Sequence, residues 1–125
     1  MIINIPVSVG ELIDKITILE IKSSKIKEKD KLSAVKKELA LLKMIFKKKK
    51  IQMKILKSDY RKLKAVNLRL WNIEDLKRKC EKQKKFGDKF IKLSRNVYLL
   101  NDKRAKYKSN INILTHSEII EVKSY

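Results

Sequence analysis

The feature that most constrains this chain is a run of 76 residues, from Glu11 to Phe86, that contains neither glycine nor proline. Because these two residues are the strongest markers of turns and helix ends, the run predicts long helices with short connections. As one uninterrupted helix it would extend over roughly 110 Å, which is too long for a compact chain of 125 residues. The run must therefore turn within itself without the help of glycine.

The first helix is marked by Ser8 and Glu11, which have the spacing of a capping box. In that motif the Ser8 hydroxyl accepts a hydrogen bond from the amide of residue 11, and the Glu11 carboxylate reaches back to the Ser8 amide. The helix then begins at Val9, and we expect it to continue to about Lys27. A mainly apolar seam follows it at helical spacing: Leu12, Ile16, Leu19, Ser23 and Ile26.

A break should follow this helix. The seam continued forward meets only polar residues, whereas the next apolar series, which starts at Leu32, is one residue out of phase. This slip predicts a break near Glu28 to Lys31, with Asp30 as the N-cap of the second segment. The turn that the long run requires is placed between Phe46 and Met53, which bracket four consecutive, mutually repelling lysines.

Two further helices complete the expected fold. The third runs to about Lys85, and Gly87 and Asp88 are then expected as the C′ glycine and the next N-cap. The last helix should end near Thr115 to Ser117, and it has the most regular apolar seam: Phe90, Leu93, Val97, Leu100, Arg104, Tyr107, Ile111 and Leu114. Short strands at 2–7 and 119–122 would pair only marginally by themselves. We therefore predict one all-α domain, 1–125, an antiparallel bundle of three to four long helices with room for short terminal β-strands.

Composition narrows the class of protein. With Cys80 as the only cysteine, neither an intrachain disulfide nor a cysteine metal cluster can form. No basic and apolar leader precedes the first helix, and no apolar run approaches the ~20 residues of a membrane span, so we expect a cytoplasmic protein. His116 is the only histidine, and no catalytic triad, P-loop or dinucleotide-binding glycine motif is present. The sequence indicates no cofactor and no metal, and it leaves enzyme activity undecided, with a non-catalytic protein favoured.

The formal net charge is +19, which is typical of proteins that bind polyanions. However, 28 lysines stand against 5 arginines, and isoleucine and asparagine are also frequent. Since all three have AT-rich codons, we favour compositional bias over selection for phosphate binding, which tends to use arginine. The polyanion alternative would use a stripe with steps of three and four residues: Lys47, Lys50, Lys54, Lys57, Arg61 and Lys64.

Arg104 interrupts the apolar seam of the last helix, and a guanidinium there must be paired or reach solvent. The candidate partners on other helices are Glu20 and Glu74. The first interpretation is a partly buried ion pair that fixes the helix register. The alternative is an anion or carboxylate site inside the bundle.

A polar and aromatic patch surrounds Trp71 on the third helix, because Asn67, Trp71 and Glu74 share one helical face and Asp75 lies beside it. Trp71 could stack on a sugar or a base while the carboxylates bind hydroxyl groups. More often such a tryptophan is a packing anchor. A second polar line, beside the seam of the last helix, contains Tyr98, Asn101, Lys108 and Asn112, with Asp102 one residue off it.

Three blocks of the chain resemble a family of small bacterial proteins known as a domain of unknown function. They are PVSVGELIDKITILEIK at 6–22, LKAVN-LW-IED at 63–75, and VY-LND-RA at 97–105 with EVKSY at 121–125. The resemblance covers the whole chain, and it implies an association with glycosyltransferase and tetratricopeptide-repeat proteins of surface-polysaccharide pathways. It supplies no catalytic residues, and the lysine-rich middle at 47–64 departs from it. Positions within the blocks that attract attention are Asp14, Glu20, Asn67, Trp71, Glu74, Asp75, Tyr98, Asn101, Asp102 and Arg104.

These observations leave three hypotheses for function. The first is a non-catalytic interaction or assembly module that serves surface-polysaccharide biosynthesis and forms a homodimer, since its amphipathic faces are long for so small a chain. The second is a nucleic-acid or anionic-lipid binder that uses the lysine stripe. The third is a bundle enzyme that uses Arg104, Glu20, Glu74 and Trp71, by fold-level analogy with chorismate mutases. It requires Arg104 and Glu74 to meet at a cavity.

Overall fold

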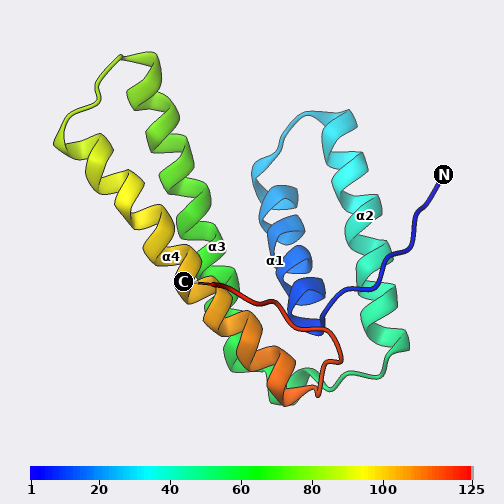
Figure 1. The fold of residues 1–125 in the computed structure, drawn as a ribbon. Coiled ribbons are helices and arrows are strands. Elements are labelled where there is room, and N and C mark those ends of the chain that lie inside the picture. Colours follow the sequence, from blue (N-terminus) through cyan, green and yellow to red (C-terminus); the bar gives the residue numbers. More distant parts are fainter. Residues whose placement is uncertain (125) are drawn as a thin grey trace.

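The computed structural model describes residues 1–124, and within them it contains four α-helices and no strand. The helices are α1 (Val9–Lys25), α2 (Lys29–Lys48), α3 (Met53–Lys82) and α4 (Asp88–Leu114). They form two helical hairpins, and α1 lies between α2 and the longer α3–α4 pair (Figure 1). The prediction of an all-α helical bundle is confirmed, and the described part of the termini is not folded into strands.

The centre of the molecule is an apolar cluster built from three helices. Ile13 of α1, Leu56 and Leu63 of α3, and Ile111 of α4 are fully buried there. Full burial of an aliphatic side chain contributes about 1.5–3 kcal/mol, so this cluster holds α1 onto the α3–α4 hairpin. A second cluster of Val66, Ile73 and Leu100 continues between α3 and α4 alone.

Helix α2 is attached differently. It has no buried residue, and it packs chiefly on α1. Its apolar seam is only half-buried, although Phe46 reaches the central cluster. In the described residues no helix combines the length and the apolar character that crossing a membrane requires.

The ends of the helices agree only in part with those predicted from the sequence. The turn at residues 49–52 lies where it was predicted. The break after α1 spans residues 26–28, a little earlier than the predicted Glu28 to Lys31, so Glu28 is the N-cap of α2 and Asp30 lies in its first turn. The prediction for Gly87 is wrong, because Lys84 takes the left-handed conformation (φ 54°) and the amide of Lys85 bonds the carbonyl of Cys80. That pairing is a Schellman ending, which glycine usually provides. Gly87 is instead the N-cap of α4.

The start of α1 is fixed by residues from the other end of the chain. The Ser8 hydroxyl caps the helix as predicted by accepting from the amide of Glu11 (3.0 Å). The amide of Gly10 donates to Asn112 Oδ1 (2.6 Å), and the amide of Val9 donates to Ser117 Oγ (3.1 Å). The free amides of this helix end are thus satisfied by α4 and by the residues that follow it.

Candidate functional site

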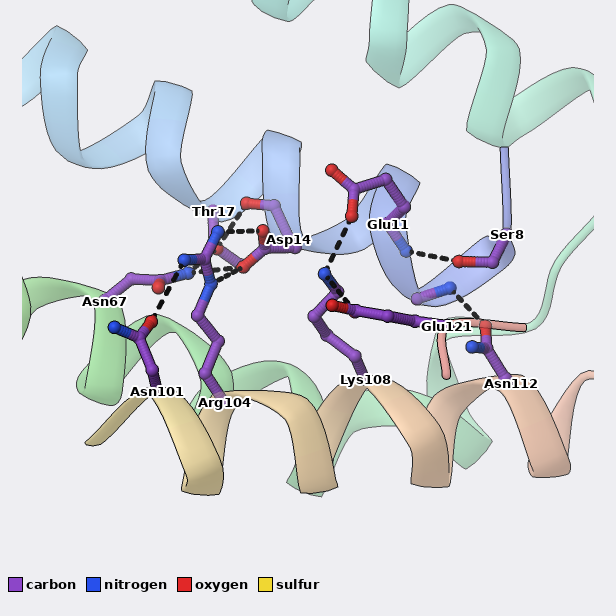
Figure 2. A network of polar contacts seen from close by, with 11 residues as sticks. Ser8, Glu11, Asp14, Thr17, Asn67, Asn101, Arg104, Lys108, Asn112 and Glu121 are labelled. Carbon is purple, nitrogen blue, oxygen red and sulfur yellow. Dashed lines mark hydrogen bonds and ion pairs between the residues drawn. The ribbon is translucent and has the colours of Figure 1, made fainter. Parts of the chain in front are cut away.

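Arg104 of α4 forms an ion pair with Asp14 of α1, at the centre of the network in Figure 2. Arg104 Nε donates to Asp14 Oδ1 (2.9 Å), and Nη2 bonds the other carboxylate oxygen. The Asp14 side chain is 1% exposed and that of Arg104 is 29% exposed. The predicted partners Glu20 and Glu74 were therefore wrong, because the α4 face that carries Arg104 packs against the first half of α1.

Polar neighbours complete the pair. Asn67 Nδ2 donates to Asp14 Oδ1 and to Thr17 Oγ1, both at 2.9 Å. Asn101 Oδ1 accepts from Arg104 Nη1 (3.3 Å). The hydrogen bond to Asp14 raises the pKa of Arg104 against the opposing effect of burial. The buried carboxylate of Asp14 is thus paired with a cation and hydrogen-bonded by two other helices, which is the condition under which a buried ion pair is tolerated.

A second charged group lies one turn along α4. Lys108 Nζ is 2.7 Å from Glu11 and 2.8 Å from Glu121, and its side chain is only 8% exposed. Glu11 therefore does not complete the capping box as predicted, since its carboxylate turns to Lys108. Burial lowers the pKa of Lys108, but the hydrogen bonds to the two glutamates outweigh burial and raise it. The bond to Lys108 lowers the pKa of Glu121.

Replacing Lys108 with methionine should lower the free energy of unfolding by about 1 kcal/mol, a value kept small because both glutamates are partly exposed. Since the pKa of Glu121 is lowered from 4.5, its contribution is present above that pH and is lost as the pH falls through the folded-state pKa. Since the pKa of Lys108 is raised from 10.5, its contribution is present below that pH and is lost as the pH rises through the folded-state pKa. Urea unfolding from pH 3 to 11 should show a stability difference that shrinks at both ends. A difference that does not change with pH would contradict the assignment.

Beside the Asp14–Arg104 pair an open cleft of about 410 Å³ lies between α1 and α3. Ile18 and Ile21 of α1 and Leu70 of α3 form its apolar lining. The polar lining brings together five residues that the sequence proposed: Asn67, Trp71, Glu74, Asp75 and Arg104, joined by Arg78. The cavity shared by Arg104 and Glu74, which the enzyme hypothesis required, is therefore present, although Arg104 is already paired on its inner side.

The cleft presents polar groups that the rest of the protein does not use. Within residues 1–124, Trp71 makes no hydrogen bond, and no buried side-chain nitrogen or oxygen lacks a partner. The indole N–H of half-buried Trp71 is therefore open to solvent, whereas a buried packing anchor would have a partner for it. Asp75 and Arg78 are exposed and have no ion pair among the described residues, while Glu74 approaches Lys77 at 3.9 Å.

Other predicted residues lie outside this cleft. Glu20 accepts a hydrogen bond from Tyr60 and lies 3.8 Å from Lys43 and from Lys64. Tyr98 is 53% exposed, and Asp102 approaches Lys123 at 4.0 Å. The lysine stripe is not continuous, because Lys47 lies in the last turn of α2 and Lys50 lies in the connecting turn with φ 55°. Its other members are on α3: Lys54, Lys57, Arg61 and Lys64.

Two polar residues at this site were not predicted from the sequence. Asp14 was noted only through the resemblance and never as the partner of Arg104, and Arg78 was not considered. A signal for Asp14 was present, since four buried positions of α1 follow steps of four, three and four: Gly10, Asp14, Thr17 and Ile21. They form a second buried face beside the apolar seam, because α1 has neighbours on several sides. In the described residues no group of three histidine, cysteine or acidic side chains could hold a metal ion.

Together these features define a small all-α protein in which a buried ion pair underlies an open cleft. The model of a family of unknown function, DUF6165, matches residues 3–125, and the chain belongs to that family. No match was found among curated proteins or among solved structures.

Proposed function

We propose that the protein is a non-catalytic binding module whose cleft holds an uncharged saccharide. The observation that carries this proposal is the lining of the cleft, in which a solvent-open indole, free carboxylate and guanidinium groups and three aliphatic side chains face one space. A sugar ring offers an apolar face for Trp71 and hydroxyl groups that both donate and accept hydrogen bonds.

The balance of charge favours a neutral ligand. Glu74 and Asp75 are opposed by Arg78 and Arg104, and Arg104 is already matched by Asp14. Glu74 also lies 3.9 Å from Lys77. A strongly anionic ligand would add negative charge beside Glu74 and Asp75, whereas hydroxyl groups can donate to those carboxylates and accept from Arg78. The lining therefore supports a neutral sugar over a small anion.

The Asp14–Arg104 pair serves this site by holding it open. Because the pair ties α1 to α4 while Asn67 ties α3 to α1, the two sides of the cleft are fixed without filling it. The carbohydrate specificity of such a cleft accords with a role as an accessory protein of surface-polysaccharide biosynthesis, the association that the family resemblance implies. In this proposal the protein presents or recognises a glycan and performs no chemistry on it.

Trp71 is the only tryptophan, so its fluorescence reports on the cleft alone. Titration with neutral mono- and oligosaccharides should shift or quench the emission in a saturable manner, with a dissociation constant in the range of about 0.01–1 mM. Replacing Asp75 with asparagine or Arg78 with alanine should weaken binding about tenfold each, since each removes a charge-assisted hydrogen bond.

Arg69→Ala is the matched control for Arg78→Ala, because Arg69 is also exposed on α3 but does not line the cleft. It should leave the dissociation constant unchanged. Equal loss of affinity in both arginine variants, or saturable binding that survives Asp75→Asn and Arg78→Ala together, would refute the assignment of this cleft. If a glycan array yields no saccharide that changes Trp71 emission, the proposal fails as a whole.

A further inference from the structure

The end of the molecule opposite the α3–α4 connection gathers basic and apolar side chains. The α2–α3 turn, the start of α3 and the end of α4 meet at this end (Figure 1), and Phe46, Ile51, Leu56 and Ile111 pack together beneath it. Four apolar residues are exposed there: Met53 39%, Ile55 49%, Ile113 69% and Leu114 43%. We call this region the basic end.

The positive charges of the basic end are not neutralised by the protein. Residues 47–64 contain nine basic residues, and in the described part of the chain only Lys64 has an ion pair, with Glu20. The one acid of this stretch, Asp59, accepts a hydrogen bond from Asn110. Helix α3 carries Lys54 in its first turn and has no acidic residue there, so the positive end of its dipole adds to the lysine charges.

We infer that the basic end docks onto an anionic lipid surface. Lysines close to such a surface contribute by long-range attraction, and exposed isoleucine, leucine and methionine side chains can enter the boundary between head groups and acyl chains. What favours the basic end over the other lysine-rich surfaces is that four consecutive lysines, Lys47 to Lys50, have no ion pair in the described residues and lie at the same end as these apolar side chains.

The same features argue against nucleic acid as the partner. Tyr60 is the only aromatic residue in 47–64, and it is half-buried with its hydroxyl engaged by Glu20, so it cannot stack on bases. Arg61 is the only arginine there, although arginine provides the forked contacts that phosphates and guanine favour. A diffuse field of lysines suits a fluid array of lipid head groups better than a defined set of phosphates.

The test is co-sedimentation of the full chain with vesicles of phosphatidylglycerol and phosphatidylcholine at 0.1 M NaCl. Binding is expected to rise with the phosphatidylglycerol fraction and to be absent from pure phosphatidylcholine. Changing Lys47, Lys48, Lys49 and Lys50 to glutamate should reduce the partition coefficient roughly a hundredfold or more. The matched control changes four exposed lysines near the α3–α4 connection by the same total charge: Lys82, Lys85, Lys89 and Lys92. The partition coefficient of this control should fall less than about tenfold. Its four lysines lie farther from the basic end than the Debye length of about 10 Å, so they contribute little to the attraction there.

Variants of the exposed apolar residues distinguish binding to lipid from binding to other polyanions. Ile113→Ser with Leu114→Ser should weaken vesicle binding about tenfold and leave binding to duplex DNA unchanged, because only lipid offers an apolar phase. Circular dichroism of every variant checks that the fold is kept. If the two lysine variants lose vesicle binding equally, the inference is overturned, because the net charge of the protein would then explain the binding without a specific docking surface. Unchanged vesicle binding in the serine variant would overturn it in favour of electrostatic adsorption without entry of apolar side chains.

Discussion

Replacing Arg104 with methionine is expected to lower the free energy of unfolding by about 3–5 kcal/mol. The substitution leaves the carboxylate of Asp14, which is 1% exposed, without its cation in the interior. Replacing Asp14 with asparagine should cost less, about 1–2 kcal/mol, since the side chain of Arg104 is 29% exposed and its guanidinium can turn toward the cleft. Urea unfolding followed by circular dichroism, with an unchanged m-value, measures both differences.

The double variant completes a double-mutant cycle with these two single variants. Because neither single change leaves a satisfied pair, the loss in Asp14→Asn with Arg104→Met should be smaller than the sum of the two single losses by at least about 1 kcal/mol. Additive losses would mean that the two side chains do not depend on each other. A larger loss in Asp14→Asn than in Arg104→Met would reverse the assignment of which charge is the buried one.

Replacing Gly10 with alanine is expected to destabilise the protein by about 2–3 kcal/mol, although alanine is normally better than glycine in a helix by about 1 kcal/mol. The added Cβ would lie 2.5 Å from the carbonyl oxygen of Lys108 and 2.9 Å from Asn112 Oδ1. The first of these is backbone and cannot move aside, so α1 must shift away from α4 and lose its bond to Asn112. Thermal and urea unfolding both measure this change.

Gly87→Ser is the control for this substitution. A Cβ at Gly87 meets nothing within 4 Å, and serine is a favourable N-cap residue. Its stability should stay within about 0.5 kcal/mol of the original, or rise. If Gly10→Ala is as stable as Gly87→Ser, the close approach of α1 and α4 is not required for folding.

Local signals in the sequence predicted the elements of the fold well. The Ser8 cap, the phase slip before Leu32 and the lysine run after Phe46 marked the start of α1, the break before α2 and the turn before α3. These features act through neighbours on the chain, so one sequence is enough to reveal them. The end of α3 was misplaced because any residue can take the left-handed position at some cost, and here Lys84 does so three residues before Gly87.

The candidate site was predictable only in part, for a geometric reason. Helical periodicity tells which residues share a face, so it grouped Asn67, Trp71 and Glu74, which do line one cleft. It does not tell which turn of one helix lies opposite which turn of another. Arg104 was therefore recognised as needing a partner, while Asp14, which lies 90 residues earlier, could not be identified as that partner.

The capping of α1 by Asn112 and Ser117 also constrains the order in which the chain can fold during synthesis. The contacts that satisfy the start of this helix join residues separated by 102 and 108 positions. A nascent chain that has emerged only as far as α3 carries Asp14 without Arg104 and leaves the amides of Val9 and Gly10 to water. Although α1 leaves the ribosome before α2, α3 and α4, it is expected to gain hydrogen-exchange protection only after α4 has been released.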